Sequence, residues 1–169
     1  SGGLIERTPL SAYINSRANG LIAISLEDRY ALTWVLLAES GDSVLICSKN
    51  GMTIHFRLND SELRPLGRAA RGVRSMNLKS GDSLVSMDVL STELADHVDK
   101  SEAKDELEDE SSVSEGPWVL VASGSGLGKR VPVTQFRLQK RAGMGLRAIK
   151  FRKNGDELVG LRVLGKGEE

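Results

Sequence analysis

Short runs in which apolar and polar residues alternate recur along this 169-residue chain, and they predict β-strands rather than helices. The run at 43–49 leads into the run at 51–57 across Lys49-Asn50-Gly51. An Asn-Gly pair between two apolar runs is typical of a tight hairpin. Apart from residues 91–116, no window keeps an apolar period of 3.6 residues. The pattern therefore predicts an all-β protein.

The same pattern occurs three times, each time between two glycines. The first glycine is Gly3, Gly51 or Gly126, and the second follows 17, 21 or 19 residues later. The residues after the second glycine keep fixed apolar offsets, whereas the distance between the glycines varies, as expected of a loop between strands. The second glycines are Gly20, Gly72 and Gly145, followed at offset four by Ile24, Met76 and Ile149 and at offset six by Leu26, Leu78 and Phe151.

Each copy reads as about four short strands, so we divide the chain into three units. In unit two the runs 72–78 and 83–90 are expected to form a second hairpin across a turn at 79–82, and unit three repeats this with 145–151 and 157–164. Four-stranded units of this length are typical of propeller blades. Units one, two and three are residues 3–42, 43–90 and 117–165 of a single domain, 1–169.

An acidic segment at 91–116 separates units two and three. It holds ten Asp or Glu against two Lys, although the whole chain has no net charge, so the remaining residues are basic. High charge without aromatic residues predicts a disordered or partly helical surface insertion. A solvated loop is the simplest interpretation, and an internal competitor for the ligand of the basic units is the alternative.

Composition argues against catalysis, cofactors and metals. The chain has one cysteine, Cys47, and two histidines, His55 and His97, without the spacing of a metal site. The glycine-rich stretch 124–130 lacks the Ser or Thr and the following helix of a phosphate-binding loop, so a turn between strands is the better interpretation. The longest apolar stretch is far too short to cross a membrane.

Basic residues are the positive signal, because they concentrate between the two glycines of each unit. One such run is usually a solvated face, but its recurrence at equivalent positions favours a curved basic track for a polyanion. Arginine dominates, which suits bidentate contact with phosphate. The main candidates are Arg57, Arg64, Arg68, Arg71, Arg74, Lys129, Arg130, Lys140, Arg141 and Arg147, with Arg7, Arg17, Lys49 and His55 as weaker ones.

The scarcity of aromatic residues narrows the ligand. Aromatics make up 4% of the chain, and Trp34, Trp118, Phe136 and Phe151 fall in predicted strands. Binders of single strands stack bases on aromatic side chains, so duplex DNA held by its phosphates is the better match. A protein-interaction propeller that binds an acidic partner is the alternative from another class.

Three stretches resemble the C-terminal domain of bacterial-type DNA gyrase A: GLIERTPLSAY from Gly3, GMTIHFRL to SLVSMDVL from Gly51, and GLGKRVPVTQF to GLRAIKF from Gly126. The related topoisomerase IV protein shares this repeat. The resemblance implies a β-pinwheel, in which propeller-like blades exchange strands and a basic perimeter wraps duplex DNA. It also implies a parent enzyme, completed by the rest of gyrase A and by gyrase B, that supercoils DNA negatively with ATP in the bacterial cytoplasm or a plastid.

The chain departs from that family in three respects. The hallmark heptapeptide Gln-Arg-Arg-Gly-Gly-Lys-Gly has only a degenerate relative, formed by Gln139, Lys140, Arg141, Gly143 and Gly145 around Ala142 and Met144. Three blades are fewer than the five or six of a family disc, so self-association that completes the disc is one expectation. The catalytic-tyrosine motif is also absent, so this chain is not expected to cut DNA.

Overall fold

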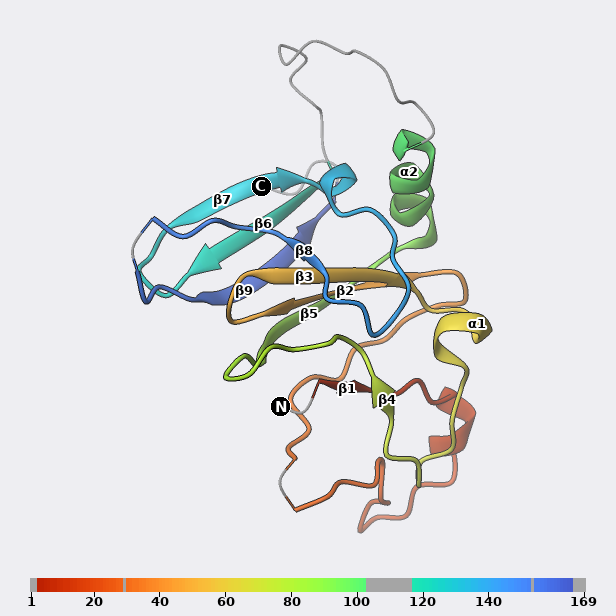
Figure 1. Ribbon diagram of the computed structural model, residues 1–169. Helices are drawn as coiled ribbons and strands as arrows, with labels where there is room; N and C mark the ends of the chain where they lie inside the picture. Colours follow the sequence, from red (N-terminus) through yellow and green to blue (C-terminus); the bar gives the residue numbers. More distant parts are fainter. Residues whose placement is uncertain (1–2, 29, 103–116, 153, 166–169) are drawn as a thin grey trace.

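The computed structural model describes residues 3–28, 30–102, 117–152 and 154–165, and strands dominate it (Figure 1). Two longer sheets lie next to each other, with a two-stranded sheet below them. The strands are β1 (Leu4–Ile5), β2 (Ser43–Ser48), β3 (Met52–Arg57), β4 (Val73–Arg74), β5 (Leu84–Leu90), β6 (Trp118–Ser123), β7 (Gly128–Pro132), β8 (Leu146–Arg147) and β9 (Leu158–Leu164). The helical segments are η1 (Leu10–Tyr13), α1 (Asp60–Leu63), α2 (Thr92–Glu102) and η2 (Val133–Gln135).

Units two and three have closely similar antiparallel cores. The predicted hairpin at Asn50-Gly51 is confirmed, since β2 pairs with β3 from Ser43 opposite Arg57 to Cys47 opposite Thr53. In unit three β6 pairs with β7 in the same way. The closing strand lies on the other side of the opening strand, β5 on β2 and β9 on β6, and both pairings shift register at equivalent points. The repeat in the sequence is therefore a repeat of structure.

The third run of each unit leaves its own unit and joins the sheet of the preceding one. β8 of unit three pairs with β3 of unit two, and β4 of unit two pairs with β1 of unit one. The predicted second hairpins, 72–78 with 83–90 and 145–151 with 157–164, are therefore wrong. The turn at 79–82 forms, but its two arms lie in different sheets because the earlier arm crosses to the neighbour. This exchange is the arrangement that the pinwheel resemblance implies.

Unit one forms less sheet than its sequence predicts. Among the described residues, β1 is its one strand, and the apolar runs at 20–26 and 31–38 are irregular. In the other units the closing strand pairs with the opening strand, and no such pair forms among the described residues of unit one. Ile22, Val35 and Leu37 are consequently 75–78% exposed, and an apolar hollow of about 500 Å³ lies between this unit and unit two.

The sheet of unit two separates two apolar clusters. Leu45 and Cys47 belong to the cluster shared with unit three, whereas Val44 and Ile46 belong to the cluster shared with β1 and β4. All six residues of β2 are buried, because apolar partners cover both of its faces. Burial raises the pKa of the Cys47 thiol to about 12. The hydrophobic effect therefore binds the units into one stack.

The acidic insertion begins as the helix α2, so residues 92–102 agree with the expectation of a partly helical segment. Leu94, Ala95 and Val98 recur at helical spacing, and Ala95 and Val98 are fully buried. This apolar stripe supplies the packing energy that the charge density seemed to exclude. The rest of the predicted insertion, 103–116, lies outside the described residues.

Candidate nucleic-acid interface

The loops that carry most of the basic residues are tied to the preceding unit by repeated backbone hydrogen bonds. In unit three, Gln139 N donates to His55 O at 2.8 Å, and Gly143 O accepts from Asn77 N at 2.8 Å. The equivalent bonds between units two and one join Leu66 N to Arg7 O and Ser25 N to Ala70 O. Each loop is therefore fixed at the boundary between two units rather than free in solution.

The second glycine of the loop permits this close approach. Gly145 has a φ of 77°, and a Cβ there would lie 2.7 Å from Thr53 O. Gly72 has a φ of 73°, and its Cβ would lie 2.8 Å from Ile5 O. Only glycine combines this left-handed conformation with backbone contact at that distance.

Arg68 and Arg141 occupy equivalent positions, four residues before the second glycine, and both bind the backbone of the preceding unit. Arg141 Nη1 donates to Arg74 O at 2.6 Å, and its Nε donates to Glu62 O at 2.6 Å. Arg68 Nη1 donates to Ile22 O at 2.9 Å. The degenerate heptapeptide thus supplies an interblade clamp, and phosphate contact by these two arginines stays a prediction.

Four other predicted cations also bind protein groups. Arg57 donates to Gly41 O and pairs with Asp96, while Arg7 binds Leu58 O and pairs with Asp60. Lys49 pairs with Glu157 at 2.7 Å, and this hydrogen bond raises the pKa of the Lys49 ammonium. The pair between Arg71 and Glu27, at 3.2 Å, involves an arginine that is 73% exposed. Solvent screens such an exposed pair, so Arg71 keeps most of its capacity for another anion.

The remaining predicted cations make no ion pair with a described residue. Arg74 and Arg147 are the second residues of the exchanged strands β4 and β8, opposite Leu4 and Met52. Each therefore lies on an edge strand of the sheet that it joins, at the same place in successive units. The exposed set comprises Arg17, Arg64, Arg74, Lys129, Arg130, Lys140 and Arg147, with the Arg130 guanidinium 5.1 Å from the centre of the Trp118 ring.

Three further cations continue this surface, although the repeat pattern did not point to them. Lys150 and Arg152 follow β8 at offsets five and seven from Gly145, and Lys79 stands at offset seven from Gly72. They extend the exchanged segment beyond Arg147 and Arg74. Reading every position of the repeat alignment from the second glycine through offset seven would have found them.

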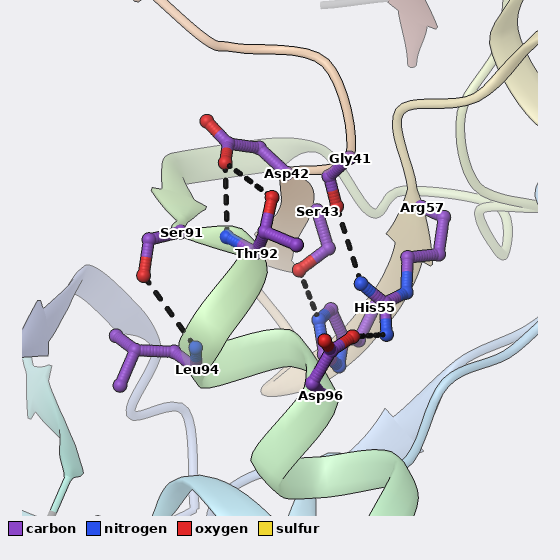
Figure 2. A network of polar contacts seen from close by, with 9 residues as sticks. All are labelled: Gly41, Asp42, Ser43, His55, Arg57, Ser91, Thr92, Leu94 and Asp96. Atoms are coloured by element: carbon purple, nitrogen blue, oxygen red, sulfur yellow. Dashed lines mark hydrogen bonds and ion pairs between the residues drawn. The ribbon is translucent and has the colours of Figure 1, made fainter.

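A buried serine and histidine lie close enough to resemble a catalytic pair, but their surroundings are structural. Ser43 Oγ is 2.7 Å from His55 Nε2, and His55 Nδ1 is 2.6 Å from Phe136 O (Figure 2 shows the first contact). Ser43 is fully buried and His55 is 1% exposed, so substrate has no access to either group. Among the described residues, no group of three or more His, Cys, Asp or Glu could hold a metal ion.

Known proteins share this sequence and architecture. The DNA gyrase A protein of Synechocystis sp. is 48% identical over 99% of this chain, and the chloroplastic/mitochondrial DNA gyrase A protein of Nicotiana benthamiana is 37% identical over 96%. The chain spans 20% and 17% of the lengths of these two relatives. The solved C-terminal domain of a DNA topoisomerase IV has the same fold, with a TM-score of 0.74 at 24% identity over 97% of this chain and 44% of that one.

The sequence profile of one family covers most of the chain. It is described as DNA gyrase C-terminal domain, beta-propeller, and it matches residues 1–39, 42–91 and 117–164, which leaves out the acidic insertion. The chain therefore belongs to the DNA gyrase C-terminal domain family.

Proposed function

We propose that this chain binds and wraps duplex DNA along the outer edges of its units. The observation that carries the proposal is the recurrence of Arg74 and Arg147 at the same position of successive exchanged strands. Exposed cations that make no ion pair with a described residue are available to phosphate, and their spacing follows the stacking of the units. Phosphate contacts of this kind hold duplex DNA without reading its sequence.

The basic residues divide into two groups with different roles. Those that bind DNA directly are the exposed cations on the loops and exchanged strands. Those that hold the loops in place include Arg68 and Arg141, whose guanidinium groups bind the neighbouring backbone. Bending stiff DNA costs about 1–6 kcal/mol for a site of 20–30 base pairs, so the contacts must be held rigidly along a curve.

The chain functions within a larger enzyme. Its relatives are DNA gyrase A proteins, and it spans about a fifth of their length. In this proposal the rest of gyrase A and gyrase B supply DNA cleavage and ATP use, and the wrap made by this domain supports negative supercoiling. Among the described helices, none has the length and the apolar character that a membrane span needs. Bacterial cytoplasm and a plastid both fit the relatives, and gyrase rather than topoisomerase IV is our assignment.

The dependence of DNA affinity on salt tests this division of roles. Each phosphate contact contributes about −0.9 to the slope of log affinity against log salt concentration. Replacing Arg74 and Arg147 with Gln should therefore make the slope less negative by about 1.8 for a duplex that reaches both units. Arg162 is the control, because it is 69% exposed but lies on β9, an edge strand of the three-stranded sheet that neither Arg74 nor Arg147 joins.

The result expected for Arg162→Gln is an unchanged slope. Equal slopes for the wild type and the Arg74→Gln, Arg147→Gln double variant would remove the exchanged strands from the interface. An acidic protein that bound the same surface while duplex DNA did not would support the alternative of a protein-interaction propeller.

A further inference from the structure

The helix α2 lies at the boundary between units two and three, in the part of the chain that the family profile leaves out. It follows β5 directly and stands beside the loop that begins at η2 of unit three (Figure 1). Three kinds of contact hold it there: a cap at its first turn, an ion pair in its middle and an apolar face.

Asp42 caps the first turn of α2 from the start of β2. Its Oδ1 accepts from Thr92 N at 3.0 Å and from Thr92 Oγ1 at 3.3 Å (Figure 2). Asp42 is 8% exposed, and its backbone oxygen also accepts from Leu58 N after β3. A side-chain oxygen at this position satisfies an amide that the helix itself leaves unpaired. The beginning of α2 is therefore joined to both ends of the β2–β3 hairpin.

Arg57, the last residue of β3, joins the middle of α2 to the same place. Its Nη2 lies 2.6 Å from Asp96 Oδ1, and its Nη1 donates to Gly41 O at 3.2 Å (Figure 2). The Arg57 side chain is only 19% exposed, far less than the cations of the outer edge. Protein partners on two sides thus hold this guanidinium between α2 and the sheet of unit two.

The apolar face of α2 connects the helix to unit three. Ala95 and Val98 are fully buried, and Val98 belongs to the cluster that contains Val133 and Phe136 of unit three. Those two residues begin the loop that carries Lys140 and Arg141. The helix is therefore part of the core at this boundary and not a loosely attached surface segment.

We propose that α2 is a brace that fixes the basic loop of unit three relative to unit two, with Arg57 and Asp96 as positioning residues. The proposal rests on the proposed function, since the feature that is positioned is the DNA track. A brace keeps successive phosphate contacts on one curve, which a stiff duplex requires. It also accounts for the burial of Arg57, which the repeat pattern assigned to DNA contact.

The alternative is that Asp96 masks Arg57 from DNA, and single variants of the intact chain distinguish the two roles. A brace predicts that Arg57→Ala and Asp96→Ala act in the same direction, and that the double variant is no worse than either. A mask predicts opposite effects, because Asp96→Ala would release a cation to DNA and Arg57→Ala would remove it. Glu93→Ala is the matched control, since Glu93 is an acid on the same helix without an ion pair to a described residue.

Two probes should be used with each variant: a 20-base-pair duplex, and a nicked plasmid that is sealed by ligase in the presence of the chain. For Arg57→Ala and Asp96→Ala we expect the duplex Kd to stay within about twofold and its salt slope to be unchanged, because no phosphate contact is lost. We expect the linking-number change of the plasmid to fall about twofold or more, because bending depends on rigid spacing. Glu93→Ala should leave both unchanged.

Hydrogen exchange gives a readout that does not depend on DNA. Amides at 133–139 should exchange faster in Asp96→Ala and in Gly41→Ala, whose new Cβ would lie 2.8 Å from Thr92 Oγ1. Unchanged exchange and unchanged wrapping in these variants would overturn the brace, as would tighter duplex binding by Asp96→Ala. If the wild type failed to bind the duplex, the proposed function would fail, and the exchange experiment would still decide the role of α2.

Discussion

The boundary between units two and three is held by contacts between the closing strands β5 and β9 as well as by the exchanged strand β8. The boundary between units one and two is held mainly by the exchanged strand β4 and its loop. Between the two closing strands, Asp88 of β5 accepts from Val163 N of β9 at 2.8 Å. Ser86 Oγ of β5 also donates to Leu161 O of β9 at 3.1 Å. Unit one has no closing strand among the described residues to make such contacts. Strand exchange alone therefore connects two units, but it does not complete the blade that receives the strand.

The difference follows from how little backbone the exchange involves. β4 and β8 each pair over two residues, so the exchanged strand contributes few ladder bonds. Apolar packing on the sheet faces supplies most of the remaining stability. In unit one that packing is incomplete, as the exposure of Val35 and Leu37 shows.

The largest effect should come from removing a shared core side chain at the better-held boundary. Phe136→Ala deletes a ring that is 3% exposed in the cluster between units two and three, and it should lower the free energy of unfolding by about 3–5 kcal/mol. The matched change in unit one, Val35→Ala, affects a side chain that is 78% exposed and should cost about 0.5 kcal/mol or less. Chemical denaturation measures both, and similar losses would contradict the difference between the boundaries.

Alanine at the second glycine should separate the contact at a unit boundary from backbone strain alone. Gly145→Ala brings a Cβ within 2.7 Å of Thr53 O at a φ of 77°, and it should cost roughly 2–4 kcal/mol. Gly20 has nearly the same φ, 78°, but nothing within 4 Å of its Cβ, so Gly20→Ala should cost only about 1–2 kcal/mol of backbone strain. Thermal unfolding of the two variants isolates the contact, and equal costs would show that the close approach to Thr53 is unimportant.

A smaller effect with the opposite sign is expected at Ala142. This residue has a φ of 63°, and its amide donates to Ser75 O at 2.9 Å. Ala142→Gly should stabilise the fold by about 1 kcal/mol, because glycine adopts this conformation without steric cost. The urea midpoint measures the gain. A loss of stability would mean that the flexibility of glycine in the unfolded chain outweighs the relieved strain.

The smallest effect is a pH dependence within unit three. A hydrogen bond from the Ser125 hydroxyl is the main cause that lowers the pKa of Asp156 from 3.8 to about 2. Because the folded-state pKa is depressed, the stabilisation is present above about pH 4 and is lost as the pH falls toward 2. Ser125→Ala should raise the pKa of Asp156 in an NMR titration. It should reduce the free energy of unfolding above about pH 4, where the stabilisation is present, and leave it unchanged near pH 2. A pKa that did not change would assign the shift to other partners.

The sequence predicts those parts of this fold that depend on local chemistry. Asn50-Gly51 specifies a turn, and alternation specifies that the flanking runs are strands. Alternation does not say which sheet a strand joins, because the run 72–78 can bury Met76 and Leu78 against its own unit or a neighbour. The prediction of second hairpins is wrong for this reason. The exchange of strands between units was predicted only by the resemblance to a pinwheel.

For the candidate site, too, the sequence predicts which segments are basic but not which neighbours their side chains contact. Repetition located the basic loops, but only geometry distinguishes Arg141, bound to Glu62 O, from Lys140, which is exposed beside it. The helix α2 agrees with the expectation of a partly helical insertion, and Leu94, Ala95 and Val98 at helical spacing account for it. The high charge density left disorder open as the alternative, because a composition argument averages over the face that packs.

Sealing a nicked plasmid in the presence of the chain at low salt tests the central claim most directly, because the linking number records whether the DNA path is wrapped. Our account predicts a change in linking number that is lost in the Arg74→Gln, Arg147→Gln double variant and kept in Arg162→Gln. An unchanged linking number with the wild-type chain, under conditions where it binds the plasmid, would contradict wrapping.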